Sequence, residues 1–428
     1  MKTSGLKLHR YCLLLGCVVY FNVACTAQTT AEQKRLEQLP QKFTQLVETG
    51  VMPGAITTVI ENGKIIHHSI VGYQDIQSKT PMAEDTIFRW YSMSKPITSV
   101  AIMMLVESGK MQLSDPIERF IPEFKNAQVY VSGDLDNMVT EPAKRSITIE
   151  DLLAHKSGIT YHFTGTTPVH QYYRKYGVKR DTPVGALPTD GAPAKDLAQL
   201  VSRLASASLL YQPGEHFAYS YSTTVLGRII EIVSQQPLDE FLQQKLFDPL
   251  QMKDAGFFVQ GKKLDRFVTN YVLNDKGLQV IETKENTDYS STARLLDGGG
   301  ALAGTSDDYL KFVEMLTNGG QLNGVKIISE QSIKQLFTPR IKMEGLGLDY
   351  DMHFALGFAK GDEETEQHDF MPVGTFGWAG SGNTIFWINP TKKQAVLFMT
   401  QVITPPPYSE QVPFRKLLID AVTDRTEH

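Results

Sequence analysis

The chain has 428 residues, 42% of them hydrophobic, so it can bury a large core, and it is longer than chains that usually form a single core. Its 42 basic and 47 acidic residues give a net charge of -5. These charges form no long runs of one sign, which leaves no electrostatic footprint for nucleic acid. We therefore expect one domain with two lobes that binds no nucleic acid.

The first 27 residues follow the pattern of a signal peptide. Three basic residues precede an apolar run over residues 11–23, and small residues lead up to Ala27. A run of about 13 residues is too short to span a bilayer, and no other stretch approaches the roughly 18 apolar residues that a span requires. The sequence thus predicts cleavage after Ala27, export to the periplasm and no membrane span.

All three cysteines lie inside this segment, at Cys12, Cys17 and Cys25. Its removal would leave no thiol, and disulfide, thiol and cysteine–metal chemistry would be lost together. Residues 23–25 partly resemble a lipoprotein box, although Asn22 stands where an aliphatic residue is usual. A form held in the envelope by a lipid anchor on Cys25 therefore stays open as an alternative.

The next segments favour a helix followed by a hairpin. Apolar residues keep helical spacing over residues 36–50, and two extended segments follow at residues 55–60 and 65–71. The Glu-Asn-Gly-Lys link between them predicts a tight β-turn. We therefore expect the two segments to pair as antiparallel strands.

The middle of the chain is predominantly helical in pattern. Residues 97–105 have the apolar spacing of a buried helix face. We expect the helix that carries this face to begin close to Ser92 and to end at Gly109. Further helices are expected after a capping box formed by Thr148 and Asp151, over residues 225–233 and over residues 238–247. Residues 160–195 are rich in Pro, Gly and Thr, and so long an irregular insertion favours a lid or a wall of a substrate pocket.

The C-terminal part returns to strands. A capped helix is expected over residues 305–316, then strands over residues 384–388 and 395–401, and an amphipathic helix that ends near Val422. Strands at both ends with helices between them indicate a sheet assembled from the two termini and a helical insertion. We expect a domain over residues 28–428, with an α/β lobe at about 35–110 and 290–425, a helical lobe at about 111–289, and a site where the lobes meet.

The first motif with chemical content is Ser92-Met93-Ser94-Lys95, at the start of the helix over residues 97–105. Ser92 and Lys95 stand at i and i+3, so they project from one helical face. A serine hydroxyl needs a base, and a lysine serves as one where burial and dipoles favour its neutral amine. The alternative is an N-cap serine followed by a solvated lysine, with Pro96 in the first turn.

Two further motifs follow. Tyr219 lies in a loop, residues 213–221, and a phenol held near a lysine can relay a proton, whereas its alternative is simple packing at a helix entry. Residues 376–382, Phe-Gly-Trp-Ala-Gly-Ser-Gly, precede the expected strand over residues 384–388. Small residues there let the backbone approach a ligand, so its N–H groups can form half of an oxyanion hole. The alternative is a glycine-rich turn.

In order and spacing these motifs resemble the serine β-lactamase and penicillin-binding protein superfamily: Ser-x-x-Lys, then Tyr-x-Asn or a variant, then Lys-Thr-Gly or a variant. The resemblance covers nearly all of residues 35–420. Shorter stretches look like class C β-lactamase relatives, namely Pro53-Gly54-Ala55, Gly72-Tyr73, residues 88–95, residues 147–158, Tyr211-Gln212-Pro213-Gly214, Leu226-Gly227-Arg228 and Gly298-Gly299-Gly300. It implies a β-lactamase/transpeptidase-like fold of the α/β plus all-α class, in which helices flank an antiparallel sheet built from both chain ends and a helical lobe is inserted.

Within that superfamily the sequence is most similar to the family VIII carboxylesterases, whose second motif is Tyr-Ser-Leu or Tyr-Ser-Val and whose third is Trp-Gly-Gly. The corresponding residues here are Tyr219-Ser220-Tyr221 and Trp378-Ala379-Gly380. The resemblance implies that Ser92 is the nucleophile, with Lys95 and Tyr219 as the acid/base pair. It also implies an oxyanion hole formed by the backbone N–H groups of Ser92 and Ser381, and a pocket lined by Trp378.

Three residues depart from the family patterns. Trp378 stands where β-lactamases and peptidases present a cation to the substrate carboxylate, and an indole cannot supply that charge. We therefore expect carboxylate-bearing substrates to bind less well. Tyr221 is bulkier than the Asn, Leu or Val of the relatives, which leaves its contacts open, and Ala379 adds one methyl group near the backbone-lined hole next to Gly380.

The sequence thus predicts an exported serine hydrolase that cleaves small carboxylic esters through an acyl-enzyme on Ser92, without metal or organic cofactor. The alternatives are β-lactamase or D-Ala peptidase activity, acyl transfer to another alcohol, and a non-catalytic envelope binding protein with the same fold. Metal hydrolysis is disfavoured because His67 and His68 point to opposite faces of a strand and the other histidines lack ligand spacing. The pattern sets neither the natural ester nor the oligomeric state.

Overall fold

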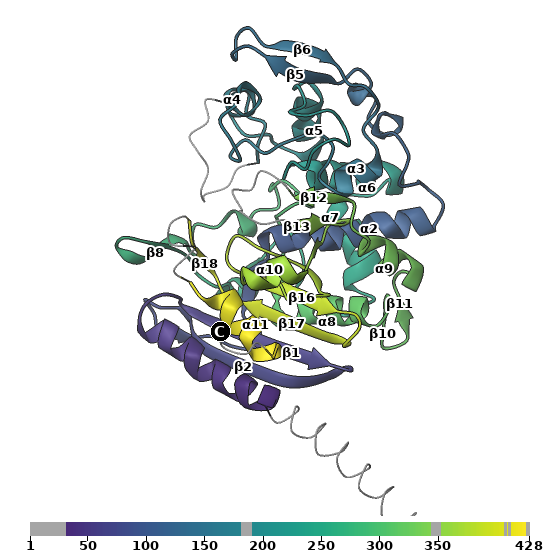
Figure 1. The fold of residues 1–428 in the computed structure, drawn as a ribbon. Helices are drawn as coiled ribbons and strands as arrows, with labels where there is room; N and C mark the ends of the chain where they lie inside the picture. Colours follow the sequence, from purple (N-terminus) through teal and green to yellow (C-terminus); the bar gives the residue numbers. More distant parts are fainter. Residues whose placement is uncertain (1–30, 181–190, 344–351, 406–408, 410–411, 425–428) are drawn as a thin grey trace, which may run out of the picture.

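The computed structural model describes residues 31–180, 191–343, 352–405, 409 and 412–424 (Figure 1). The predicted signal peptide, residues 1–27, lies with its three cysteines outside these ranges. Within them, no helix combines the length and the apolar character needed to cross a membrane.

In the described part of the chain, nine strands form a central antiparallel sheet to which both ends of the chain contribute. These strands are β1 (Gly54–Glu61), β2 (Lys64–Asp75), β3 (Thr80–Pro81), β12 (Ile341–Met343), β13 (Met352–Phe354), β14 (Ala359–Lys360), β15 (Phe376–Ala379), β16 (Ile385–Asn389) and β17 (Gln394–Met399). Their order is β12-β13-β14-β15-β16-β17-β1-β2-β3, so the N-terminal strands join the C-terminal strands where β1 pairs with β17. This confirms the sheet built from both termini.

The expected hairpin between β1 and β2 is present. Its link contains Asn62 and Gly63, whose φ angles are 50° and 71°. Two successive positive φ angles suit a two-residue hairpin turn, and asparagine and glycine are the residues that adopt them at least cost. The Asn-Gly pair is therefore a local signal that the sequence alone carries.

Helices cover both faces of the sheet (Figure 1). On one face, the helix of residues 31–48 and α11 (Phe414–Val422) pack around Phe398, whose ring lies 5.0 Å from that of Phe43 and 5.6 Å from that of Phe414. On the other face, α8 (Ser306–Thr317) places Tyr309 against Phe386 at 5.2 Å. Because β16 and β17 are buried throughout, their sequences are nearly continuous hydrophobic runs.

The chain between the two parts of the sheet contains most of the remaining elements. Its helices are α2 (Ser94–Glu107), α3 (Ile149–Leu153), α4 (Pro168–Lys175), α5 (Leu197–Ala205), α6 (Ser222–Ser234) and α7 (Leu238–Leu242), with α9 (Glu330–Leu336) and α10 (Glu363–Gln367) nearer the C-terminus. Short strands pair outside the sheet: β4 (Ile87–Arg89) with β9 (Ala303–Thr305), β5 (Gln128–Ser132) with β6 (Val139–Pro142), β7 (Asn270–Asn274) with β8 (Gly277–Glu282) and with β18 (Val402–Ile403), and β10 (Gln321–Leu322) with β11 (Val325–Lys326). The capping box at Thr148 and Asp151 opens α3 as expected.

The insertion over residues 111–289 is helical in most of its ordered elements, but it also contains the hairpins β5–β6 and β7–β8. Helical periodicity did not indicate these hairpins, because their strands are short and, apart from β7, have exposed positions. The predicted irregular segment over residues 160–195 likewise contains α4. The expected long helix over residues 238–247 consists of α7 followed by one π-turn, Gln243–Phe247.

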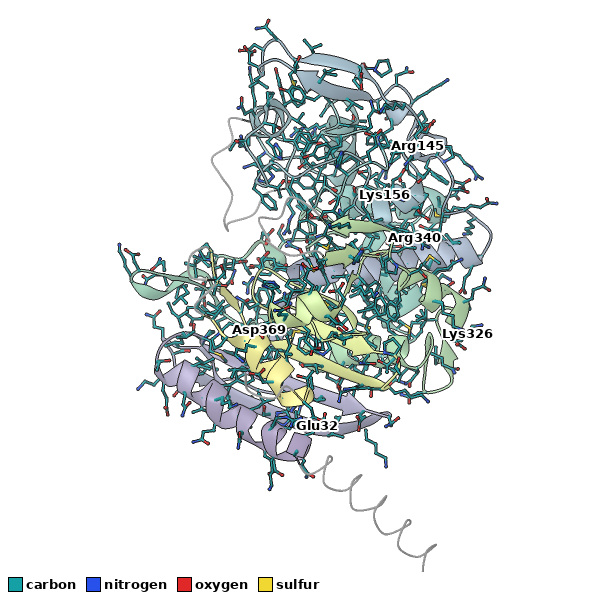
Figure 2. All side chains as sticks on the ribbon, viewed as in Figure 1. Glu32, Arg145, Lys156, Lys326, Arg340 and Asp369 are labelled. Carbon is teal, nitrogen blue, oxygen red and sulfur yellow. The ribbon has the colours of Figure 1, made fainter. Side chains whose placement is uncertain are left out.

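Ion pairs connect the insertion to the end of the sheet. Figure 2 shows Arg145, Lys156 and Arg340 close together, where α3 approaches β12. Glu150 on α3 accepts from Lys156 Nζ at 2.8 Å and forms an ion pair with Arg340, whose Nε lies 3.3 Å from Glu150 Oε2. Partly exposed pairs of this kind each contribute about 0–1 kcal/mol, so they orient the contact more than they stabilise it.

Candidate active site

Ser92 lies at a sharp turn between β4 and α2. The pairing of β4 with β9 continues through a hydrogen bond from Trp90 N to Leu302 O at 3.0 Å, and the Trp90 ring is fully buried. Tyr91 then takes a φ of 47°, which costs a bulky residue backbone strain. Ser92 follows as the middle residue of a 3-10 turn, Tyr91–Met93, and α2 begins directly after it at Ser94, close to Ser92 as expected.

Lys95 stands on the first turn of α2 and is 1% exposed. Its Nζ donates to Ser92 Oγ at 3.1 Å and to the carbonyl oxygen of Gly299 at 2.6 Å. The same nitrogen lies 4.6 Å from the centre of the Tyr219 ring and 5.6 Å from that of Tyr161. The solvated lysine of the alternative interpretation is therefore wrong, because this amine is buried against the serine hydroxyl.

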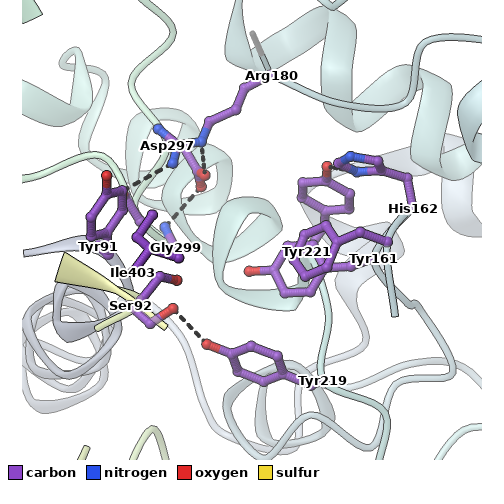
Figure 3. A pocket seen from close by; sticks show the side chains of 13 residues that line it. Tyr91, Ser92, Tyr161, His162, Arg180, Tyr219, Tyr221, Asp297, Gly299 and Ile403 are labelled. Atoms are coloured by element: carbon purple, nitrogen blue, oxygen red, sulfur yellow. Dashed lines mark hydrogen bonds and ion pairs between the residues drawn. The ribbon is translucent and has the colours of Figure 1, made fainter. Parts of the chain in front are cut away.

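Tyr219 approaches Ser92 from the insertion. Its hydroxyl donates to Ser92 Oγ at 2.6 Å (Figure 3). The serine oxygen therefore accepts from this phenol and from the Lys95 amine together. The Tyr219 loop is fastened to His155, because Ala218 N donates to His155 O at 2.7 Å and Ser220 Oγ lies 3.0 Å from His155 Nδ1. His155 belongs to residues 147–158, a stretch that resembles class C β-lactamase relatives. This stretch thus holds the Tyr219 loop in place.

The His155 ring is buried beside the Tyr219 ring, with centroids 5.0 Å apart. Burial, and after it the positive charge of Lys95, holds the pKa of His155 well below its usual value. The imidazole is therefore neutral near neutral pH and adds no charge next to Ser92.

The third motif, residues 376–382, forms β15 and the turn after it, and this turn reaches the Ser92 cavity. Ser381 lines the cavity that contains Ser92, whereas Trp378, Ala379 and Gly380 are not among its lining residues. The Trp378 ring packs instead against Tyr219, at 5.7 Å, so the expectation that it lines the pocket differs from its position in the structure. A Cβ on Gly380 would lie 2.5 Å from the Trp90 carbonyl oxygen, which explains why only glycine lets the two backbones approach.

Two backbone amides near Ser92 Oγ have no acceptor of their own. Neither the N–H of Ser92 nor that of Ser381 donates a hydrogen bond to another residue that the structure describes. Ser381 is exposed and Ser92 lies at the cavity wall. Both N–H groups are thus available to a ligand oxygen, which is what an oxyanion hole requires.

The cavity has a volume of about 240 Å³, and four tyrosines and one phenylalanine are among its lining residues (Figure 3). Tyr221 is buried, and its hydroxyl lies 2.7 Å from His162 Nδ1, which answers the open question about its contacts. Burial, and then Asp297, raises the pKa of Tyr221 well above its usual value, so it stays a neutral phenol. The described lining residues are Tyr91, Ser92, Tyr161, His162, Phe163, Arg180, Tyr219, Tyr221, Asp297, Gly299, Gly300, Ser381 and Ile403.

Several of these residues were not singled out from the sequence. Tyr161, His162, Phe163 and Arg180 come from the described parts of the segment 160–195, which was expected to form a lid or a pocket wall, and they do form part of the wall. Asp297 precedes the glycine triplet and accepts from Gly299 N at 2.8 Å. Two local features of the sequence could have pointed to these lining residues: the long insertion over residues 160–195, and the acidic Asp297 directly before three glycines.

Among the described residues, no group of three or more His, Cys, Asp or Glu side chains is arranged to hold a metal ion. His68 lies 3.0 Å from Thr58 Oγ1 and from Glu84 Oε1, while His67 contacts Ser69 Oγ at 3.0 Å. These neighbouring histidines therefore make separate side-chain contacts on the strand β2.

Known proteins share this fold and sequence. The β-lactamase family model matches residues 39–421. An uncharacterized protein of Mycobacterium tuberculosis, MT1414, is 32% identical over 369 residues, which cover 83% of this chain and 88% of that protein. Esterase EstB of Burkholderia gladioli is 27% identical over 299 residues, covering 65% and 69% of the two chains. The solved structure of EstCE1, described as a hydrolase with promiscuous acyltransferase activity, superposes with a TM-score of 0.73 at 24% identity, covering 91% of this chain and 99% of that one. With the Ser92 turn, the two-ended sheet and a family match over most of its length, the chain belongs to the β-lactamase family of serine hydrolases.

Proposed function

We propose that this protein hydrolyses small carboxylic esters through an acyl-enzyme on Ser92. The observation that carries the proposal is the pair of hydrogen bonds to Ser92 Oγ, from Lys95 Nζ at 3.1 Å and from Tyr219 OH at 2.6 Å. Two groups that can each hold or release a proton thus touch the nucleophile directly. A structural serine has no need of both.

Acylation would begin with attack of Ser92 Oγ on the ester carbonyl carbon. The hydroxyl proton passes to the Lys95–Tyr219 pair, and the two residues share general-base and general-acid duty. The carbonyl oxygen becomes an oxyanion that accepts from the N–H groups of Ser92 and Ser381. When the intermediate collapses, the bond to the alcohol oxygen breaks, and the pair returns its proton to that oxygen.

Deacylation repeats these steps with water. Water gives a proton to the same pair and attacks the acyl carbonyl carbon, and the new oxyanion occupies the same two N–H groups. Collapse breaks the bond to Ser92 Oγ, which takes the proton back, and the carboxylic acid leaves. The sequence consumes one ester and one water and needs no other reactant.

The cavity supports a small substrate. Its volume of about 240 Å³ and its tyrosine-rich wall suit a short apolar group better than a long polar chain. Gly380 supports the Ser381 end of the proposed hole by letting the backbone that follows β15 lie close to Trp90. Trp378 packs against Tyr219 and would hold its ring in place.

Ser92→Ala should abolish hydrolysis of p-nitrophenyl acetate and butyrate, because no other oxygen occupies the position between Lys95 and Tyr219. Ser108→Ala, an exposed change at the far end of the same helix, is the matched control and should keep full activity. Both variants should unfold at the wild-type temperature. Turnover retained by Ser92→Ala would remove this residue from the mechanism.

Two further measurements separate the rivals. A fluorophosphonate probe should label Ser92 in the wild type, and failure to label would favour a non-catalytic binding protein. Nitrocefin turnover that exceeds ester turnover would favour β-lactamase activity instead.

We also propose that the mature protein, residues 28–428, is exported to the periplasm after removal of residues 1–27, with the two lobes at the boundaries given above. The composition of the leader supports this. The N-terminal mass of the secreted protein tests it, because a lipid on Cys25 would leave a heavier, acylated N-terminus.

A further inference from the structure

The wall of the cavity carries a cation that the proposed acylation steps do not use. Arg180 lines the same cavity as Ser92. Its Nε pairs with Asp297 Oδ2 at 3.3 Å, and its Nη2 donates to the carbonyl oxygen of Gly300 at 3.2 Å (Figure 3). A guanidinium has five N–H donors, so these contacts leave donors for a ligand in the cavity.

In the ion pair of Arg180 and Asp297, the guanidinium lies nearer to the cavity than the carboxylate does. Asp297 Oδ1 accepts from Thr224 Oγ1 at 2.7 Å and from Gly299 N at 2.8 Å, so this carboxylate is held from the protein side. Its side chain is 4% exposed, whereas that of Arg180 is 16% exposed. A molecule in the cavity therefore reaches the guanidinium more readily than the carboxylate.

Arg180 is the only lysine or arginine among the lining residues that the structure describes. Asp297 is the only carboxylate among the lining residues that the structure describes. Burial first, and then the charges of Lys179, Arg174 and Arg180, lowers the pKa of His162 to about 4. The His162 imidazole is therefore neutral near neutral pH, which leaves the Arg180 guanidinium as the cation that an anion in the cavity would meet.

We propose that Arg180 is a specificity-determining residue that binds a carboxylate on the substrate, at a distance from the ester bond that Ser92 attacks. The preferred substrates are then small esters that carry a negative charge on the acyl or the alcohol part. This inference rests on the proposed function, since it names the substrate class for the same site. A planar guanidinium with free donors matches a carboxylate well.

This proposal revises the expectation drawn from the third motif. Trp378 supplies no cation, and its ring packs on Tyr219 and Phe354 and does not line the cavity. The positive charge comes from the insertion instead, through Arg180. Carboxylate-bearing esters therefore meet a cation at a different place on the cavity wall.

Two pairs of esters test the idea, because each pair differs only in charge at nearly constant size. In the first pair, monoethyl succinate carries a carboxylate on the acyl side, and ethyl butyrate is its neutral counterpart. In the second pair, the anion of 4-acetoxybenzoic acid carries the carboxylate on the alcohol side, and its methyl ester is the neutral counterpart. The measured quantity is the ratio of kcat/KM for the charged ester to that for the neutral ester, so a general change in activity cancels.

In the wild type we expect a ratio of about 10 or more for one of the two pairs, and Arg180→Gln should lower that ratio about 10- to 100-fold, as the loss of a charge-assisted contact predicts. Arg180→Lys should fall between the two. Arg119→Gln, which removes an exposed cation paired with Asp115 in another part of the insertion, controls for net charge and should keep the wild-type ratio.

Arg180→Gln leaves the buried Asp297 carboxylate without its cation, which can disturb the fold. The double variant Arg180→Gln/Asp297→Asn removes that charge as well, and its ratio of kcat/KM values should be as low as that of Arg180→Gln. A wild-type ratio near or below one for both pairs overturns the proposal. So does an unchanged ratio in the folded Arg180 variants. Either result leaves the proposed function standing if neutral esters are cleaved in a Ser92-dependent way, whereas loss of that dependence removes the proposed function itself.

Discussion

The hydroxyl of Ser92 accepts from two donors that come from different parts of the chain, and the phenol is the more easily isolated of the two. Tyr219→Phe removes only the oxygen that lies 2.6 Å from Ser92 Oγ. The ring still packs against His155 and Trp378. We expect kcat for p-nitrophenyl butyrate to fall about 10²- to 10⁴-fold, the usual value of one general acid–base group, with little change in thermal stability.

Tyr211→Phe provides the matched control, because Tyr211 is an exposed tyrosine at the start of the same loop. It should keep wild-type kinetics. If Tyr219→Phe retains more than about a tenth of the wild-type kcat, Tyr219 is not part of the proton transfer, and Lys95 would have to act without it.

At the level of residues, the sequence was informative wherever the signal was local. Ser92 and Lys95 are three positions apart, and the structure brings them together with Tyr219 as the motifs suggested. Arg180 could not be found in this way, because its contact with Gly300 joins positions 120 apart in the chain. Only the folded arrangement shows that the insertion delivers a cation to the Ser92 cavity.

At the level of elements, helices and long strands were predictable because their apolar periodicity is strong. The turn that carries Ser92 was not, since Tyr91 has a φ of 47° and no glycine marks the place. The tertiary pairing of β4 with β9 and the packing around Trp90 impose that conformation on a residue that disfavours it.

Gly304 on β9 should therefore be essential to the shape of the Ser92 turn. A Cβ at this position would lie 2.3 Å from Cζ2 of the buried Trp90 ring, and the ring has no room to move. We expect Gly304→Ala to lower the free energy of unfolding by about 1–3 kcal/mol, as overpacking usually does, and to reduce kcat because Trp90 lies two residues before Ser92. Urea denaturation and ester kinetics measure the two effects.

Gly256→Ala is the corresponding control. Gly256 forms backbone hydrogen bonds with Ala303, the residue next to Gly304. A Cβ on Gly256 would have open space around it, because Phe258 N, the nearest atom beyond its chain neighbours, lies 4.0 Å away. It should leave stability and activity near the wild-type values. Equal effects of the two substitutions would show that the contact with Trp90 does not matter.

For the whole molecule, the order of elements along the chain was enough to predict a sheet assembled from both termini, and the pairing of β1 with β17 confirms it. The two hairpins inside the insertion were missed, because strands of four to six residues have weak period-two patterns. One consequence of that insertion is global. It buries three histidines, His155, His162 and His170, which the sequence did not distinguish from surface histidines.

These histidines should make the protein sensitive to acid. Burial is the first cause that lowers the pKa of each one, to about 4 for His162 and His170 and well below 6.5 for His155. In the unfolded chain they protonate near pH 6.5, so the unfolded state binds more protons below that pH. The stabilisation is complete above pH 6.5 and is lost as the pH falls toward the folded-state values.

The slope is measurable for one residue at a time. Each histidine that titrates only in the unfolded state removes up to about 1.4 kcal/mol per pH unit between pH 6.5 and 4. Burial raises the pKa of Glu314 and Asp308, and their protonation opposes this loss, so the wild-type curve alone is not decisive. Comparison with His162→Gln cancels those acids: urea denaturation at pH 7.5, 6.5, 5.5 and 4.5 should give a shallower loss in the variant. Parallel curves for the two proteins would mean that His162 protonates equally well in the folded state, contrary to the effect expected first from its burial and then from the nearby cations.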